Sequence, residues 1–91
     1  MNNSFVNIEN KAFVRVAEIV YIEAADSDKV RLILARANLK ITNPEVIDTT
    51  SDKETSSIIF LKDNKYCISS VNASVLVKRA QSDTSELTDE K

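Results

Sequence analysis

The chain has 91 residues, of which 43% are apolar, and a formal net charge of −2. This length allows one small domain with a thin core, and no apolar run approaches the roughly 20 residues that a membrane-spanning helix needs. The sequence has no histidine, no glycine and one cysteine, Cys67. These absences argue against histidine-based catalysis, glycine-rich phosphate loops and the common zinc sites, so we expect no enzyme activity, small-molecule substrate, metal or cofactor.

The first predicted element is a β-hairpin near the N-terminus. The stretches FVNI (5–8) and AFVRV (12–16) are rich in Val, Phe and Ile and flank a polar turn over 9–11. Asn10 tolerates the left-handed backbone conformation that such a turn requires, and it takes the part that glycine often has. The pattern therefore predicts two short antiparallel strands.

A second hairpin is predicted over 19–34. IVYIEA (19–24) is a strand by composition, DSDK (26–29) is a turn, and VRLILAR (30–36) alternates between a fully apolar face and a mixed face. The apolar residues of 29–40 also fit helical spacing, so a helix is the competing interpretation of this segment. We favour the strand because the run follows a turn and alternates well.

One short helix is predicted over 44–48. Pro44 suits a first helical position, Asn43 can cap the helix, and Glu45 complements the helix dipole.

The second half of the chain predicts a further hairpin. A polar linker over 49–57 leads to the apolar stretches IIFL (58–61) and YCIS (66–69), and SVLVKRA (74–80) is a last strand or a short helix. Between Tyr66 and Ile68, Cys67 fits a packing position better than a reactive one.

The charge is concentrated at the C-terminal end. Residues 82–91 (SDTSELTDEK) carry four acids and one lysine, whereas residues 1–81 carry eleven bases and ten acids. Because the terminal segment has one large apolar side chain, it cannot bury a core, and the sequence predicts a single β-rich domain over 1–81 with a disordered acidic tail over 82–91. A body charge of +1 is small for a nucleic-acid binder, which disfavours nucleic acid as the partner.

Residues 5–25 can be aligned with residues 59–80. Both stretches have a strand, an acid-Asn-Lys turn and a second strand, with Asn10 and Asn64 at equivalent places. The similarity indicates an internal duplication or the ordinary reuse of hairpins. With either origin the predicted fold is mainly β, a small antiparallel sheet of two hairpin-based units with one short helix.

Six residues are candidate partner-binding positions. They are Tyr21, Glu23, Arg31, Tyr66, Lys78 and Arg79. Tyrosines are frequent anchors of interfaces, and the opposite charges of the two aligned units favour pairing between them. The ordinary alternative is that the charged residues only solvate a half-buried sheet and that the tyrosines lie at its margin.

The stretch VRVAEIVYIEAADSDKVRLIL (14–34) resembles the first half of LytTR-type DNA-binding domains, in which a "YIEA" strand leads into a hairpin. The matching residues are Ile19, Tyr21, Ile22, Glu23 and Ala24. VNASVLVK (71–78) is similar to a later segment of that family, with Asn72 and Ala73 where the family has a DNA-contacting His-Arg pair. The N-terminal stretch is also similar to small FlbD-like motility proteins. The LytTR resemblance implies a DNA-binding regulator of transcription.

The free edges of a small sheet must be covered or paired, and this sequence has little that blocks them. We therefore predict a non-catalytic protein-binding or assembly module that acts through its sheet edges and its mixed sheet face, as a homodimer or with a protein partner. A lone cysteine and an N-terminus without a signal-peptide pattern favour the cytoplasm, away from any membrane. The alternative is a LytTR-like DNA-binding transcriptional regulator, which would bind with steep salt dependence.

Overall fold

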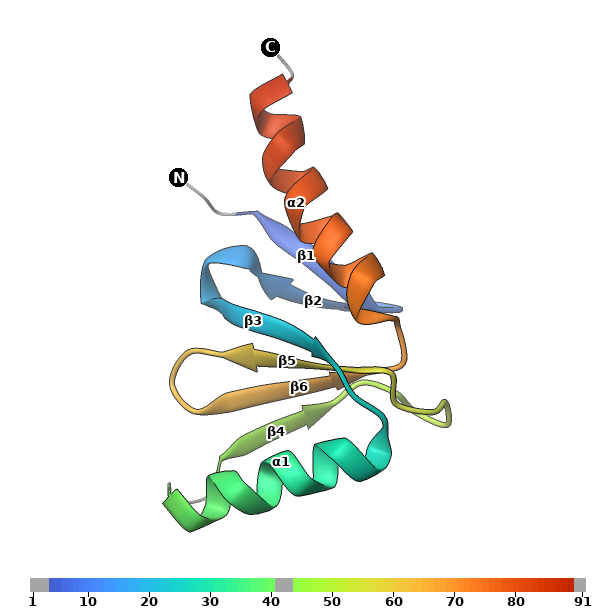
Figure 1. Cartoon of the computed structure of the whole chain (residues 1–91). Helices are drawn as coiled ribbons and strands as arrows, with labels where there is room; N and C mark the ends of the chain where they lie inside the picture. The colour runs from blue at the N-terminus through green and yellow to red at the C-terminus, as the bar shows by residue number, and fades with distance from the viewer. Residues whose placement is uncertain (1–3, 41–43, 90–91) are drawn as a thin grey trace.

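The computed structural model describes the backbone of residues 4–40 and 44–89 and the side chains of residues 4–37, 39 and 44–81 (Figure 1). The elements in chain order are β1 (Phe5–Glu9), β2 (Ala12–Arg15), a 3-10 turn (Val16–Glu18), β3 (Ile19–Ala24), α1 (Ser27–Lys40), β4 (Glu45–Asp48), β5 (Ser57–Leu61), β6 (Lys65–Ser69) and α2 (Ala73–Asp89). The mainly β fold class is confirmed. The described residues form two α-helices, however, and neither of them is the short helix predicted over 44–48.

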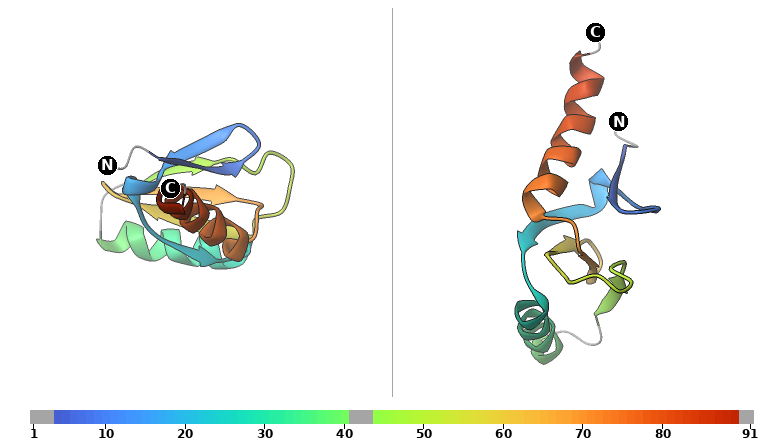
Figure 2. Two further views of the ribbon diagram at one scale, coloured as in Figure 1. Left: turned by 90° about the horizontal axis from the view of Figure 1, so that it is seen from above. Right: turned by 90° about the vertical axis from the view of Figure 1, so that its right-hand side faces the viewer.

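The centre of the fold is a four-stranded sheet with the order β3-β5-β6-β4, and β1 and β2 form a separate hairpin. The pairings β3–β5 and β5–β6 are antiparallel, whereas β4 joins β6 in parallel. One face of the sheet packs against α1, and the other packs against the hairpin and the start of α2 (Figures 1 and 2). The molecule therefore has three layers.

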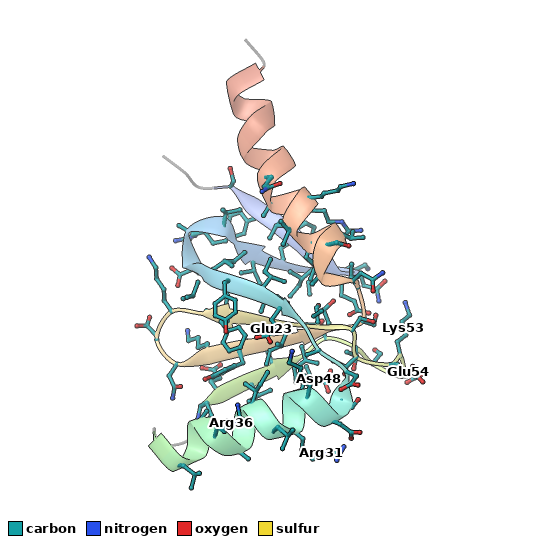
Figure 3. The ribbon with its side chains drawn as sticks, viewed as in Figure 1. Glu23, Arg31, Arg36, Asp48, Lys53 and Glu54 are labelled. Carbon is teal, nitrogen blue, oxygen red and sulfur yellow. The ribbon has the colours of Figure 1, made fainter. Side chains whose placement is uncertain are left out.

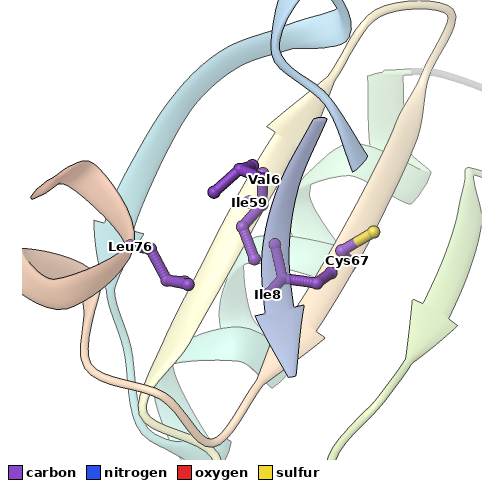
Figure 4. Close-up of a cluster of buried hydrophobic side chains, with 5 residues drawn as sticks. All are labelled: Val6, Ile8, Ile59, Cys67 and Leu76. Atoms are coloured by element: carbon purple, nitrogen blue, oxygen red, sulfur yellow. The ribbon is translucent and has the colours of Figure 1, made fainter. Parts of the chain in front are cut away.

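The two faces of the sheet hold two separate apolar clusters, because successive residues of a strand point to opposite faces. Ile59 and Cys67 contribute to the cluster under the hairpin and α2, together with Val6, Ile8 and Leu76 (Figure 4). Their neighbours Ile58 and Ile68 contribute to the cluster under α1. Each fully buried aliphatic side chain contributes about 1.5–3 kcal/mol of hydrophobic free energy, so β5 and β6 hold the layers together.

Both terminal hairpin predictions are confirmed. β1 pairs with β2 around Asn10, whose φ is 44°, and β5 pairs with β6 around Asp63 and Asn64, whose φ values are 63° and 60°. Asn and Asp tolerate the left-handed region, so these side chains make tight turns possible in a chain without glycine. The packing position predicted for Cys67 is also confirmed, since its side chain is buried between the layers.

The strand predicted over 30–36 is wrong, because residues 27–40 form the helix α1. Asp26 is its N-cap: the Asp26 carboxylate accepts the Lys29 backbone N–H at 2.9 Å, and the Asp26 carbonyl accepts the Val30 N–H at 3.0 Å. The residues that suggested a hairpin turn thus start a helix. β3 pairs with β5 instead, far along the chain.

The helix predicted over 44–48 is wrong as well, because Glu45–Asp48 is the strand β4. The Glu45 N–H donates to the Asn64 carbonyl at 3.1 Å, and the Thr49 N–H donates to the Ile68 carbonyl at 3.0 Å. These bonds fix β4 beside β6 in the parallel orientation. The predicted capping residue Asn43 lies outside the described residues.

The segment 74–80, which the sequence leaves open between strand and helix, belongs to α2. The two aligned units consequently differ: the first continues from its hairpin into β3, and the second continues into a helix. α2 runs to Asp89 and so enters the segment 82–91, whose side chains lie outside the described part; the acidic disordered tail stays a prediction. Over their described residues, neither helix has the length and apolar character needed to cross a membrane.

Candidate functional site

Three aromatic rings stand side by side on the α1 face of the sheet, one on each of three adjacent strands. The register places Tyr21 of β3 opposite Phe60 of β5, and Phe60 opposite Tyr66 of β6. The Tyr21 and Phe60 rings are stacked, with their centroids 4.3 Å apart and their planes 8° apart, and the Tyr66 ring is tilted by 60° against Phe60. Because β3 is an edge strand, Tyr21 ends the row and keeps 51% of its surface exposed.

A groove of about 520 Å³ lies between this aromatic row and α1. We call it the aromatic groove; it is lined by Tyr21, Glu23, Phe60 and Tyr66 of the sheet and by Lys29, Leu32, Ile33, Arg36 and Ala37 of α1. The α1 residues recur every three or four positions, which places them along one side of the helix. The groove is therefore built by two elements that the apolar cluster under α1 holds together.

The polar groups of the groove are arranged around Glu23. The Lys29 ammonium lies 2.8 Å from the Glu23 carboxylate, and the Tyr21 hydroxyl donates to the same carboxylate at 3.4 Å. The hydrogen bond from Lys29 lowers the pKa of Glu23, and burial together with the Glu23 charge raises the pKa of Tyr21. The groove thus combines the Glu23–Lys29 ion pair, the Arg36 guanidinium and the hydroxyls of two tyrosines.

A second surface is the outer edge of β4, which we call the β4 edge (Glu45–Asp48). All four residues are exposed, and the apolar side chains of Val46 and Ile47 keep 38% and 39% of their surface in contact with solvent. Since the N–H groups of Glu45 and Thr49 point to β6, the alternation of a strand turns the N–H of Val46 to the open side. No strand of the described residues pairs with this side.

A family model for RemA-like proteins, described as extracellular matrix regulatory protein A-like, matches residues 5–80. The chain belongs to the RemA-like family. The match spans both sheets, α1 and the part of α2 that packs on the body. No curated protein matches the chain significantly. The resemblance of residues 14–34 to LytTR-type and FlbD-like proteins stays a prediction.

Three of the six predicted partner-binding residues lie close together in this RemA-like fold. Tyr21, Glu23 and Tyr66 line the aromatic groove. Arg31 lies on α1 (Figure 3) but is not among the residues that line the groove. Its guanidinium is 3.2 Å from the Asp28 carboxylate.

The other two predicted residues, Lys78 and Arg79, belong to α2, across the sheet from the groove. The Arg79 guanidinium donates to the Asn7 carbonyl at 2.9 Å. Within the chain, Glu23 pairs with Lys29 and not with the bases of the second unit.

The partner-binding residues predicted from the sequence do not include three residues of this site, Phe60, Lys29 and Arg36. The ring of Phe60 joins the two tyrosines only through the pairing of β3 with β5, which the predicted hairpin over 19–34 excluded. Helical spacing over 29–40 was the signal that would have placed Lys29 and Arg36 together on one side of α1.

Catalytic and metal-binding groups are few. Burial raises the pKa of the Cys67 thiol to about 11, with a smaller effect of Glu45, so this cysteine is a poor nucleophile at neutral pH. In the portion of the chain with described side chains, no cluster of three or more His, Cys, Asp or Glu residues is arranged to hold a metal ion.

Proposed function

We propose that this RemA-like protein is a non-catalytic regulatory protein that acts by binding, and that it self-associates through the β4 edge. The description of its family as regulatory supports the first part. The second part rests on the exposed outer side of β4, with which no strand of the described residues pairs; this is the observation that carries the proposal.

The β4 edge has the properties of a pairing surface. Its outward N–H and C=O groups at Val46 are available to a partner strand, and Val46 and Ile47 place apolar side chains on both faces of that strand. The strand itself contains no proline and no lysine, the residues that commonly block an edge. A partner strand would thus gain backbone hydrogen bonds and apolar contact together.

A two-fold homodimer is the simplest assembly that uses this edge. Antiparallel pairing with Val46 opposite Val46 of the second copy lets these residues exchange both backbone hydrogen bonds. That register also places Glu45 opposite Ile47 of the partner copy, so that it does not set Glu45 and Asp48, two like charges, directly opposite each other.

Sedimentation of the whole protein tests the proposal. We expect a dimer at micromolar concentration that persists at high salt, because backbone pairing and apolar burial are screened much less than surface ion pairs. Val46→Pro removes an outward N–H without removing a bond to β6, and it should give a monomer.

The matched control is Val46→Thr, which keeps the backbone donor and a β-branched side chain and should remain dimeric. Circular dichroism establishes that both variants keep their secondary structure. A wild-type monomer would contradict the proposal, as would a Val46→Pro variant that is folded and still dimeric. A larger closed assembly would point to head-to-tail pairing of the β4 edge with β3 of the next copy.

A further inference from the structure

We propose that the aromatic groove is a ligand site for a planar aromatic ring that carries a phosphate group, which is the chemistry of a nucleotide. The ligand is held and not converted. Two observations carry the inference: an aromatic stack that is open at one end, and an arginine that lines the same groove and has no ion-pair or hydrogen-bond partner among the described residues.

The aromatic stack ends at an edge of the sheet. Phe60 covers one face of the Tyr21 ring at a centroid distance of 4.3 Å, and Tyr21 belongs to the edge strand β3 and remains half exposed. A flat ring placed on the open side of Tyr21 extends the existing stack. Base stacking on aromatic side chains works for every base, because each base has a π-face.

The cations of α1 differ in their partners. Lys29 lies 2.8 Å from Glu23, and Arg31 lies 3.2 Å from Asp28. Arg36 makes no ion pair or hydrogen bond with any side chain or backbone group of the described residues, although its side chain lines the groove. A planar guanidinium with free donors is suited to bidentate contact with phosphate oxygens.

The groove has the size and the mixed lining that such a ligand needs. Its volume of about 520 Å³ falls within the range of roughly 300–1,000 Å³ typical of small-molecule sites. Leu32 and Ile33 give it an apolar wall, and the Glu23 carboxylate is an acceptor for the amino group of a base. Figure 3 shows Glu23 on the sheet and Arg36 on α1, which are the two sides of the groove.

Isothermal titration calorimetry of the whole protein tests the site with three probes. Adenosine monophosphate combines a ring with a phosphate, adenosine lacks the phosphate, and inorganic phosphate lacks the ring. We expect saturable binding of the nucleotide at submillimolar concentration, binding of adenosine at least about tenfold weaker, and no saturable binding of phosphate alone. Equal binding of adenosine and its monophosphate would contradict the role of Arg36.

Three substitutions assign the contacts. Tyr21→Leu removes the open end of the stack, Arg36→Gln removes the free guanidinium, and each should weaken nucleotide binding by about tenfold or more. Arg31→Gln is the matched control, because it removes the same charge from the same helix outside the groove and should leave the affinity unchanged. An equal loss in Arg31→Gln and Arg36→Gln would show general charge attraction and overturn the proposal.

The ring and phosphate of the ligand could belong to a free nucleotide or to a nucleic-acid strand, and a short single-stranded oligonucleotide distinguishes these two sources. Binding much tighter than that of the mononucleotide, and still lost in Tyr21→Leu, would identify a nucleic-acid strand as the ligand, whereas similar affinities would identify a free nucleotide. If neither adenosine monophosphate nor the oligonucleotide binds saturably at millimolar concentration, the proposal is overturned. The substituted residues are not part of the β4 edge, so the sedimentation test of dimerisation and the calorimetric test of ligand binding can succeed or fail independently.

Discussion

The Ser70 backbone N–H donates a hydrogen bond of 2.8 Å to the carboxylate of Glu9, which lies 61 positions earlier in the chain and is buried. The Ser70 hydroxyl donates to the same carboxylate, and the hydroxyls of Ser69 and Thr49 lie 3.1 and 3.3 Å from it. The donors that the described residues supply to this anion are all neutral. It ties the end of β1 to the segment that follows β6, and so fixes the hairpin on the sheet.

Replacing this carboxylate should destabilise the fold. Glu9→Gln keeps the shape of the side chain but turns two charge-assisted hydrogen bonds into weaker ones and brings an amide donor against the Ser70 donors. We expect a loss of about 1–3 kcal/mol in the free energy of unfolding, measured by urea denaturation. Glu54→Gln removes the same charge from an exposed loop and should cost much less. A Glu9→Gln variant as stable as Glu54→Gln would mean that the carboxylate is not a structural tie.

The Glu9 carboxylate also predicts the direction in which the free energy of unfolding changes with pH. Burial raises the pKa of Glu9, but its hydrogen bonds, led by the Ser70 N–H, outweigh burial and hold the pKa below its ordinary value of 4.5. A depressed folded-state pKa gives stability that is present above the unfolded-state pKa and is lost as the pH falls through the folded one. Unfolding free energies measured from neutral pH down to pH values below 4.5 should therefore decline more steeply for the wild type than for Glu9→Gln. Parallel curves for the two proteins would contradict this assignment.

The start of α1 offers a test of local helix stabilisation. Asp26→Ala removes the acceptor of the Lys29 N–H and should lower the free energy of unfolding by about 1 kcal/mol. The control is Asp28→Ala, which removes the exposed pair with Arg31 and a negative charge from the first turn of α1, and should have a smaller effect. Thermal unfolding followed by circular dichroism measures both. A larger loss for Asp28→Ala would mean that the charge of Asp28, and not the cap, is the main stabilising group at this end of the helix.

Sequence reasoning succeeded where the deciding interactions are local. The turns at Asn10 and at Asp63–Asn64 depend on side chains that accept a positive φ, and this preference is readable in the chain itself. It failed for 30–36, where the apolar residues fit both periodicities. The outcome there depends on β5, which supplies the partner of β3 and leaves the following segment to form a helix.

The candidate site was predictable only in part for the same reason. Tyr21, Glu23 and Tyr66 were chosen for the chemistry of their own side chains, but their meeting in one groove requires the register of three strands. The β4 edge could not be predicted from the sequence, because a four-residue strand after Pro44 is specified by its parallel pairing with β6 and not by its own residues.

The last prediction concerns duplex DNA, the partner that the LytTR resemblance implies. Lys29 and Arg31 are paired with acids, Arg15 lies over the Phe5 ring at 5.6 Å, and Arg79 contacts Asn7 on the other side of the sheet. These cations are spread over separate surfaces and do not form the basic stripe that follows a DNA backbone. We therefore expect weak association without sequence preference, which disappears when the salt concentration rises from about 50 mM to about 200 mM. Fluorescence anisotropy with labelled duplexes measures this dependence. A sequence-specific complex that survives the higher salt would favour DNA-dependent regulation over assembly through the β4 edge as the function of this protein.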